Sequence, residues 1–301
     1  MTTAVSTAKL GKRYGSLWAL CNCNLNIEKG SVVALVGPNG AGKTTLLSLI
    51  MGLTRPTTGH VTLSGGIAAG SSEALRQVSF MAQEHPLYRR FRVRDLLLMG
   101  QKLNDDWDGE WAKRHLIDLD IPLDRPAGKL SGGQHAQVSL TMTLAKRAPV
   151  VLLDEPVAAL DPLARRDFMA LLMDRVAETG VTVILSSHVV SELERVCDYL
   201  VVLSGSEVQV AGDIGELIAV HRRLIGPAAA SEPSGVDAVI QKIATEKQTN
   251  LLARVAGPIP DPQWQSRPVS LEDIVIAYLG APDAEYLPAA QLSSVPGGGE
   301  Q

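Results

Sequence analysis

Short apolar runs alternate along the chain with longer segments of helical periodicity. Three runs rich in Val, Leu and Ile have the length of buried strands, at 31–36, 150–153 and 181–185. Helix-like apolar spacing follows the first run over 43–51 and separates the other two over 163–179. A strand, a helix and a further strand in this order predict a mostly parallel sheet with right-handed crossovers, and therefore an α/β fold. Shorter strands are expected at 61–63, 199–203 and 207–210.

The composition changes after about residue 222, and we divide the chain there into residues 1–222 and a C-terminal extension, 223–301. A Pro/Ala/Ser/Gly segment over 226–235 predicts a linker. Beyond it we expect a helix over 236–247, a strand over 251–255, a short helix over 270–279 opened by the capping-box variant Ser270-Leu-Glu-Asp273, and a Gly-rich tail that frays. The extension holds the whole net negative charge and no phosphate-binding motif, so we expect it to be dispensable for phosphate chemistry.

Composition and charge exclude several classes of protein. Hydrophobic residues make up 46% of the 301 residues and charged residues 20%, which is too apolar for a disordered chain. Lys and Arg number 28 against 32 Asp and Glu, and this balance argues against a nucleic-acid partner. Three cysteines without zinc spacing favour a reducing compartment. The pattern contains no membrane span and no secretory signal, so work at a membrane would require a separate partner.

A glycine-rich segment follows the first buried strand and opens the first helix. The sequence Gly37-Pro-Asn-Gly-Ala-Gly-Lys-Thr44 matches G-x-x-x-x-G-K-[ST] at every fixed position. Its glycines let backbone N–H groups face phosphate oxygens, and the helix N-terminus adds a partial positive charge. The alternative is a chance glycine-rich turn, which the flanking strand and helix disfavour. The candidate nucleotide-binding residues of this loop are Gly37, Pro38, Asn39, Gly40, Ala41, Gly42, Lys43, Thr44 and Thr45.

Two carboxylates leave the strand over 150–153 at its C-terminal end. Ligand sites in open α/β sheets lie at that edge. Asp154 is expected to hold Mg²⁺, together with the hydroxyl of Thr44, and Glu155 to polarise the attacking water. By themselves these carboxylates could equally cap a helix or lie in a solvated turn. Their pairing with a phosphate loop favours the catalytic interpretation.

Further motifs make a family resemblance specific. Leu130-Ser-Gly-Gly-Gln134 opens a helical stretch, His188 follows the strand over 181–185, and Gln83, Asp161 and Tyr14 occupy the expected intervals. Over roughly residues 5–220 the chain resembles the ATP-binding subunit of an ATP-binding-cassette (ABC) transporter. The resemblance implies a P-loop NTPase core, an antiparallel β subdomain and a helical signature subdomain at about 84–148.

The resemblance also implies roles for single residues. In this family two cassettes bind head to tail and enclose two ATP molecules. The signature segment of one subunit, with Ser131, Gly132, Gly133 and Gln134, contacts the γ-phosphate held by the other. Tyr14 stacks on adenine, Gln83 contacts Mg²⁺ or the water, His188 bonds the γ-phosphate, and Asp161 crosses the dimer interface. Taken alone, Ser131 could be only an N-cap, Tyr14 a packed tyrosine and His188 a turn residue.

Two features of the helical subdomain depend on the family less directly. The segment His135-Ala-Gln137 departs from the basic residues that many members carry after the signature, which bears on how hydrolysis is tuned. Four arginines lie within Arg89-Arg-Phe-Arg-Val-Arg94. They form either a solvated, acid-paired face or a contact with the membrane subunit.

The resemblance predicts an ATPase that powers a membrane transporter, with ATP and Mg²⁺ as ligands. A separate transmembrane permease and a second cassette, identical rather than different, are the expected partners, at the cytoplasmic face of the cell membrane. The helix over 270–279 resembles the closing helix of bacterial drug, antibiotic and ion exporters, so export is expected. The alternatives are a non-transport cassette acting on ribosomes or DNA, and an inactive regulatory cassette.

Overall fold

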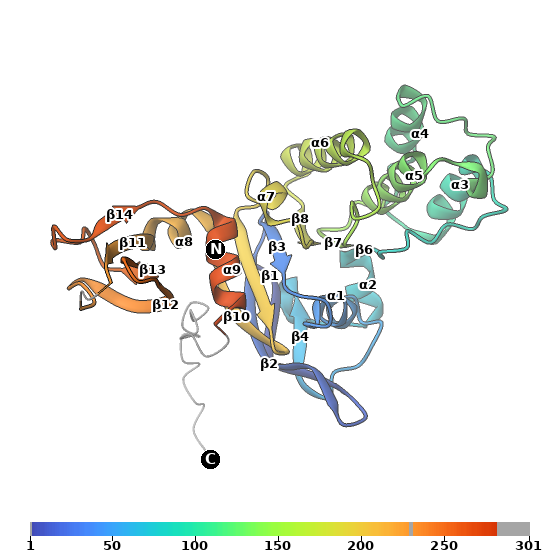
Figure 1. The fold of residues 1–301 in the computed structure, drawn as a ribbon. Helices are drawn as coiled ribbons and strands as arrows, with labels where there is room; N and C mark the ends of the chain where they lie inside the picture. Colours follow the sequence, from blue (N-terminus) through green and yellow to red (C-terminus); the bar gives the residue numbers. More distant parts are fainter. Residues whose placement is uncertain (1, 229–230, 282–301) are drawn as a thin grey trace, which may run out of the picture.

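The computed structural model describes residues 2–228 and 231–281. The tail expected to fray lies outside these residues. A six-stranded sheet of order β10-β9-β3-β8-β7-β6 forms the centre, and its strands run parallel except β10 (Figure 1). The strands are β3 (Val32–Val36), β6 (Val78–Met81), β7 (Val150–Asp154), β8 (Thr182–Ser186), β9 (Tyr199–Ser204) and β10 (Glu207–Asp213). This confirms the parallel sheet and the strands that the apolar runs predict.

Both faces of this sheet are covered, which explains why its strands are apolar throughout. Alternate residues of β3 point to opposite faces: Val33 and Leu35 pack with α1 (Lys43–Met51), while Ala34 packs with α5 (Gly132–Ala145) and α6 (Pro162–Thr179). Helix α6 ends at Gly180, as its sequence predicts. The short helices α2 (Ser72–Gln77) and α7 (Val190–Leu193) complete the covering.

Two subdomains are attached to this core, as the resemblance implies. An antiparallel sheet of order β2-β1-β4-β5 packs over the α1 face. Its strands are β1 (Thr3–Tyr14), β2 (Leu17–Glu28), β4 (Thr58–Leu63) and β5 (Ile67–Ala68). The helical subdomain consists of α3 (Val93–Leu103), α4 (Gly109–Asp118) and α5, around a small core of its own. One-turn 3-10 helices lie at Ser64–Gly66 and Ala127–Lys129.

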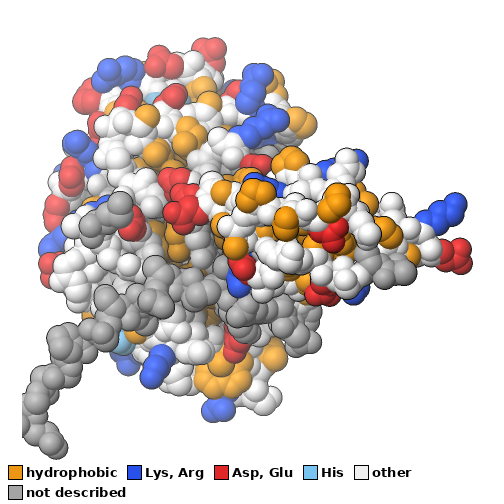
Figure 2. Space-filling model, turned by 90° about the vertical axis from the view of Figure 1, so that its left-hand side faces the viewer, with side chains coloured by type: hydrophobic (Ala, Val, Ile, Leu, Met, Phe, Trp, Pro, Cys, Tyr) orange, Lys and Arg blue, Asp and Glu red, His pale blue; other side chains and the backbone are white. Residues whose placement is uncertain are grey.

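The C-terminal extension is mainly β-structure, which differs from the sequence prediction. Its antiparallel sheet has the order β12-β13-β11-β14, and it lies at the opposite end of the molecule from the helical subdomain (Figure 1). Helix α8 (Ile214–Val220) leads into the extension, and β11 (His221–Pro227) crosses its expected boundary. The remaining elements are β12 (Val236–Ala244), β13 (Gln248–Val255), β14 (Gln265–Arg267) and α9 (Leu271–Leu279). Seen from this end, apolar side chains lie among charged ones on the surface (Figure 2).

The prediction of a helix over 236–247 is wrong. These residues form β12 and a hairpin with β13, closed by a hydrogen bond from Thr245 N–H to Gln248 O of 2.8 Å. The segment is rich in β-branched residues, and pairing with β13 satisfies its backbone groups in a way that a single sequence window does not reveal.

Helix α9 begins with the expected capping box, and it packs into the central core of the cassette. Ser270 Oγ accepts a hydrogen bond from Asp273 N–H, and Asp273 accepts one from Ser270 N–H, both at 3.1 Å. Ile274 and Tyr278 are fully buried in the same apolar cluster as Leu200 of the central sheet. The boundary expected after residue 222 lies inside β11, so the extension continues the fold without an unstructured break there.

Within the described residues, no helix has the length and apolar character needed to cross a membrane.

Candidate active site

A pocket of about 890 Å³ lies at the carboxyl edge of the central sheet. Most of the phosphate loop lines it, together with Gln83, Glu155 and His188. Leu17, Trp18, Ala19 and Ser206 also line it. Residues that are far apart in the sequence meet here because parallel strands end at one edge.

The shape of the phosphate loop depends on glycine at two positions. A Cβ on Gly37 would lie 2.3 Å from Leu203 O, and one on Gly42 would lie 2.4 Å from Ala19 O. Gly42 also has φ of 104°, a conformation that favours glycine. Gly42 is the N-cap of α1 and lines the pocket, so the positive end of the helix faces the pocket. The first turn of α1 holds no acidic residue that would offset this charge.

Lys43 supplies a buried positive charge at the loop. Its side chain is 6% exposed, and its Nζ donates hydrogen bonds to Gly37 O at 2.8 Å and Pro38 O at 3.3 Å. The same ammonium lies 3.5 Å from Glu155 Oε1. A buried ammonium held in this position can bind an anion together with the N–H groups of the loop.

The two carboxylates after β7 have different partners. Asp154 is 2% exposed, and its Oδ1 accepts a hydrogen bond of 2.7 Å from Ser186 Oγ. Glu155 faces Lys43 and His188, with 3.1 Å between Glu155 Oε2 and His188 Nδ1. The two adjacent side chains therefore serve separate environments: Asp154 ends β7, and Glu155 follows it with a positive φ.

Ser186 is a residue that the sequence reasoning missed. Besides donating to Asp154, its hydroxyl accepts the N–H of Glu155 at 2.8 Å. Glu155 has φ of 45°, an uncommon conformation for a non-glycine residue, and this hydrogen bond helps to hold it. The signal available in the sequence was the position of Ser186 at the end of β8, next to the expected His188.

Comparisons with known proteins agree with this arrangement. A family profile described as ABC transporter matches residues 20–158. The chain is 34% identical over 211 residues to the thiamine import ATP-binding protein ThiQ of Jannaschia sp., covering 68% of this chain and 92% of that protein. This chain belongs to the ATP-binding proteins of ABC transporters. Members of this family are ATPases that bind ATP with Mg²⁺.

Two further likenesses define the extent of the match. The cassette is 35% identical over 218 residues to the sulfate/thiosulfate import ATP-binding protein CysA of Synechococcus elongatus, covering 71% of this chain but 63% of that protein. It therefore spans less than two thirds of the length of CysA. A solved dimeric bacterial ABC transporter cassette superposes with a TM-score of 0.62 at 27% identity, over 69% of this chain and 98% of that one. The α/β cassette fold is thereby confirmed.

The signature segment and Asp161 do not line the pocket of their own cassette. Ser131 is the exposed N-cap of α5, in a capping box with Gln134, and a side chain on the exposed Gly132 would meet no atom within 4 Å. Gly133 lies next to α6, where a Cβ would be 3.2 Å from Ala164 Cβ. Asp161 caps α6 by accepting from two backbone N–H groups at 3.0 Å. The capping interpretation of Ser131 is therefore correct, Asp161 is an N-cap as well, and a role of either residue in a second cassette's site stays a prediction.

Tyr14 also lies outside the residues that line the pocket. Its side chain is 54% exposed, and Lys12 Nζ lies 5.1 Å from the centroid of its ring. The aromatic residue that does line the pocket is Trp18, which the sequence reasoning did not select.

The residues present fit Mg²⁺ and a triphosphate. Asp154 offers a carboxylate whose one described hydrogen-bond partner is Ser186, and Thr44 offers a hydroxyl at the start of α1. Oxygen donors of this kind suit Mg²⁺, while Lys43 and the N–H groups of the loop suit phosphate. Gln83 lines the same pocket and can add an amide oxygen.

Two histidines lie where the segment after Gln83 meets the signature helix. His85 is 8% exposed, and burial lowers its pKa, with nearby His135 acting in the same direction. A hydrogen bond to the backbone of Pro156 acts against this shift. Burial and Arg89 lower the pKa of His135 as well. Burial thus favours the neutral form of both imidazoles, and His85 lies against the backbone of Pro156, the residue that follows Glu155.

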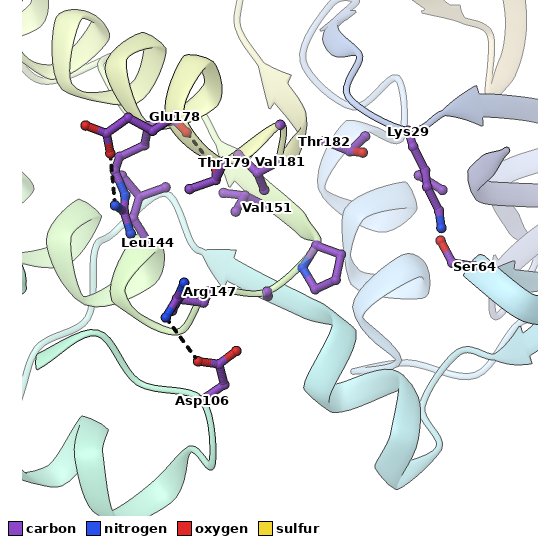
Figure 3. A pocket seen from close by; sticks show the side chains of 15 residues that line it. Lys29, Ser64, Asp106, Leu144, Arg147, Val151, Glu178, Thr179, Val181 and Thr182 are labelled. Atoms are coloured by element: carbon purple, nitrogen blue, oxygen red, sulfur yellow. Dashed lines mark hydrogen bonds and ion pairs between the residues drawn. The ribbon is translucent and has the colours of Figure 1, made fainter. Parts of the chain in front are cut away.

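A second pocket, of about 520 Å³, lies at the opposite, amino-terminal ends of β7 and β8. Two ion pairs lie in it, Arg147 with Asp106 and Arg175 with Glu178 (Figure 3). None of the predicted site residues lines it. The carboxyl-edge pocket is therefore the candidate active site.

Proposed function

We propose that this cassette binds and hydrolyses MgATP and that its hydrolysis powers a membrane transporter. The observation that carries the proposal is the convergence of Lys43, Glu155 and His188 beside the phosphate loop. The Glu155 carboxylate lies 3.5 Å from Lys43 Nζ and 3.1 Å from His188 Nδ1. The intact set argues against an inactive regulatory cassette.

Each residue has a task that follows from its position. The loop N–H groups and Lys43 neutralise the phosphate oxygens, which is the main requirement of phosphoryl transfer. Bound Mg²⁺ would supply further charge neutralisation, held by Thr44, Asp154 and Gln83. Glu155 would accept a proton from the attacking water, and His188 would keep Glu155 and the γ-phosphate in register.

Closure of two cassettes around ATP is part of the proposal. Ser131 and Gly132 are exposed at the N-terminus of α5, which makes them accessible to a phosphate held by a second copy. The solved dimeric relative supports this arrangement. We propose a homodimer, with a heterodimer as the alternative.

A separate permease is the proposed membrane partner, on the cytoplasmic side. In the segment after Gln83, Tyr88 is 63% exposed and Phe91 is 42% exposed, and their ring centroids are 5.2 Å apart. Arg92 and Arg94 pair with Asp124, so part of the arginine cluster is the acid-paired face that was the alternative. The exposed aromatic pair supports a contact with the permease.

The relatives do not support the export direction that the resemblance of the helix over 270–279 predicted. Both ThiQ and CysA are named as import proteins, so they give no support to export. We therefore restrict the proposal to ATP-driven transport. Transport by the reconstituted cassette and permease in vesicles, with ATP on one side at a time, measures the direction.

The test of nucleotide binding is Lys43→Ala. Loss of the ammonium removes the counter-charge for the phosphates, so the variant should lose MgATP binding in equilibrium titration while keeping its circular dichroism spectrum. Unchanged ATP affinity in this variant would contradict the proposed site.

The test of closure is size-exclusion chromatography of Glu155→Gln, which should hold ATP without turning it over. We expect a dimer with saturating ATP and a monomer without it. Addition of Ser131→Ala to the same variant should weaken the dimer, and a monomer under saturating ATP would contradict the homodimer.

A further inference from the structure

A buried arginine that the phosphate chemistry does not use joins the central core to the helical subdomain. Arg175 lies on α6 and is 7% exposed. Its guanidinium carbon is 4.0 Å from the centroid of the Trp111 ring on α4. Its terminal nitrogens pair with Asp108 Oδ2 at 3.4 Å and with Glu178 Oε2 at 3.1 Å. A buried guanidinium is unfavourable without such partners, so these contacts hold the side chain in one place.

The two partners of Arg175 on the subdomain side connect it to α4 and α5. Trp111 packs against the apolar clusters of both the central core and the helical subdomain. Asp108 is the N-cap of α4, and its Oδ1 accepts a hydrogen bond of 3.2 Å from Trp111 N–H. The N–H of Asp108 donates to Ala145 O at 2.8 Å, and Ala145 is the last residue of α5. One aspartate therefore links Arg175 to the start of α4 and to the end of α5.

The other end of α5 carries the signature segment. Ser131 caps its N-terminus, and Gly133 lies against α6, where a Cβ would be 3.2 Å from Ala164 Cβ. The helix is thus held to α6 at both ends, by close approach at its N-terminus and through Asp108 at its C-terminus.

The length of α5 makes its direction important for the signature segment. Its 14 residues span about 20 Å. A tilt of about 10° at the end next to Asp108 would therefore displace Ser131 by roughly 3–4 Å. Hydrogen bonds to a phosphate keep their strength over only about 0.5 Å of donor–acceptor distance. Prevention of this tilt is therefore a condition for Ser131 to reach a nucleotide held by a second cassette.

We propose that Arg175 is a positioning residue for the closure of two cassettes. Through Trp111 and Asp108 it fixes the direction of α5, so that Ser131 reaches the γ-phosphate held by the second cassette. The side chains that pair with Arg175 do not line the pocket of the phosphate loop, so Arg175 takes no part in ATP binding by its own cassette. This inference rests on the proposed closure around ATP.

Two measurements on the full-length chain with Glu155→Gln separate closure from ATP binding. Added Arg175→Met keeps an unbranched side chain and removes the guanidinium. It should raise the protein concentration at which half of the chain is dimeric under saturating MgATP by about tenfold. At protein concentrations where both chains are monomers, titration should give a MgATP affinity within about twofold of the Glu155→Gln chain. Added Arg114→Met, at an exposed position of α4, is the matched control and should change neither quantity by more than about twofold.

Variants of Trp111 keep the test decisive if Arg175→Met folds poorly. Trp111→Leu removes the aromatic face and should weaken the ATP-dependent dimer by about tenfold, while Trp111→Phe keeps a ring for the guanidinium and should weaken it by less than about threefold. The double variant Arg175→Met/Trp111→Leu should lose about as much as either single variant, because the two side chains act as one contact.

Three results would overturn the inference. The first is an unchanged dimer in Arg175→Met or in Trp111→Leu. The second is an equal loss of MgATP affinity in the monomer and of dimer formation, which would show a general loss of structure instead of a misplaced signature segment. The third is a dimer weakened as much by Trp111→Phe as by Trp111→Leu.

Failure of the proposed closure and failure of this inference are distinguishable. If the Glu155→Gln chain stays monomeric under saturating MgATP, the proposed homodimer is wrong and the inference falls with it. If that chain dimerises and added Ser131→Ala weakens the dimer, closure through the signature segment stands, and the variants of Arg175 and Trp111 alone decide the inference.

Discussion

His188 Nδ1 lies 3.1 Å from Glu155 Oε2, at the carboxyl edge of the central sheet. The two residues come from the ends of neighbouring strands, β8 and β7. His188 is 55% exposed and Glu155 is 12% exposed. An accessible imidazole therefore contacts a sheltered carboxylate, an arrangement suited to sensing a phosphate that enters between them.

Glu155→Gln should bind MgATP about as well as the parent while its turnover falls by roughly 10²-fold or more, the usual scale for losing a general base. The amide keeps the size of the side chain but cannot accept the proton of the water. ATP affinity and turnover measured on one preparation check this. His188→Ala should also lose turnover, and a variant of Glu155 that lost binding but kept its rate per bound ATP would reverse the assignment.

Asp154→Asn should weaken the Mg²⁺-dependent part of ATP binding itself. The amide is a poorer ligand for Mg²⁺ than a carboxylate, and Asp154 is buried at 2% exposure, so water cannot replace its charge. Titration of ATP with and without Mg²⁺ measures this part. Equal Mg²⁺ dependence in the variant and the parent would exclude Asp154 as a metal ligand.

Ser186→Ala should lower both stability and turnover. The substitution leaves the N–H of Glu155 and one oxygen of Asp154 without their hydrogen-bond partner, which costs about 1–3 kcal/mol of unfolding free energy for a buried group. Ser187→Ala is the control, because the Ser187 hydroxyl accepts from Val189 N–H instead of contacting the carboxylates. Urea unfolding and turnover of both variants provide the comparison, and equal effects of the two would contradict the role of Ser186.

Ile274→Ala should destabilise the whole cassette by about 2–5 kcal/mol, because Ile274 is fully buried in the core that α9 shares with the sheet. Ile276 is on the same helix and is 57% exposed, so Ile276→Ala should change stability by less than about 0.5 kcal/mol.

Because α9 is part of the central core, truncation after residue 222 should give an unstable chain, against the sequence-based expectation that the extension is dispensable. A soluble, active truncated cassette would restore that expectation.

Stability should fall on acidification through the histidine between α8 and α9. His221 is fully buried; its Nδ1 is 2.7 Å from Leu217 O and its Nε2 is 3.1 Å from Tyr278 Oη. Burial lowers its pKa, and Arg254 on β13 acts in the same direction, while the contact with Leu217 opposes the shift. The unfolded chain therefore takes up a proton near pH 6.5, at about the ordinary pKa of histidine, where the folded chain does not.

The stability contributed by neutral His221 is thus present above about pH 6.5 and decreases as the pH falls toward the lowered pKa. Urea unfolding at about pH 7.5 and about pH 5.5 measures the slope. His221→Gln should reduce it, while His60→Asn, at an exposed position of β4, should not. An unchanged slope in His221→Gln would show that other groups carry the acid sensitivity.

The sequence by itself determined the phosphate loop, α1, the carboxylates after β7 and His188. These features depend on local rules: glycine spacing sets the loop, apolar runs set the buried strands, and polar residues follow where strands leave the core. Only the tertiary structure decided that 236–244 pairs as β12 and that α9 belongs to the central core. It also decided that Ser186 joins Asp154 to Glu155, and that Trp18 rather than Tyr14 lines the pocket. Each of these depends on contacts between segments far apart in the chain, whose pairing and burial energies no local window contains.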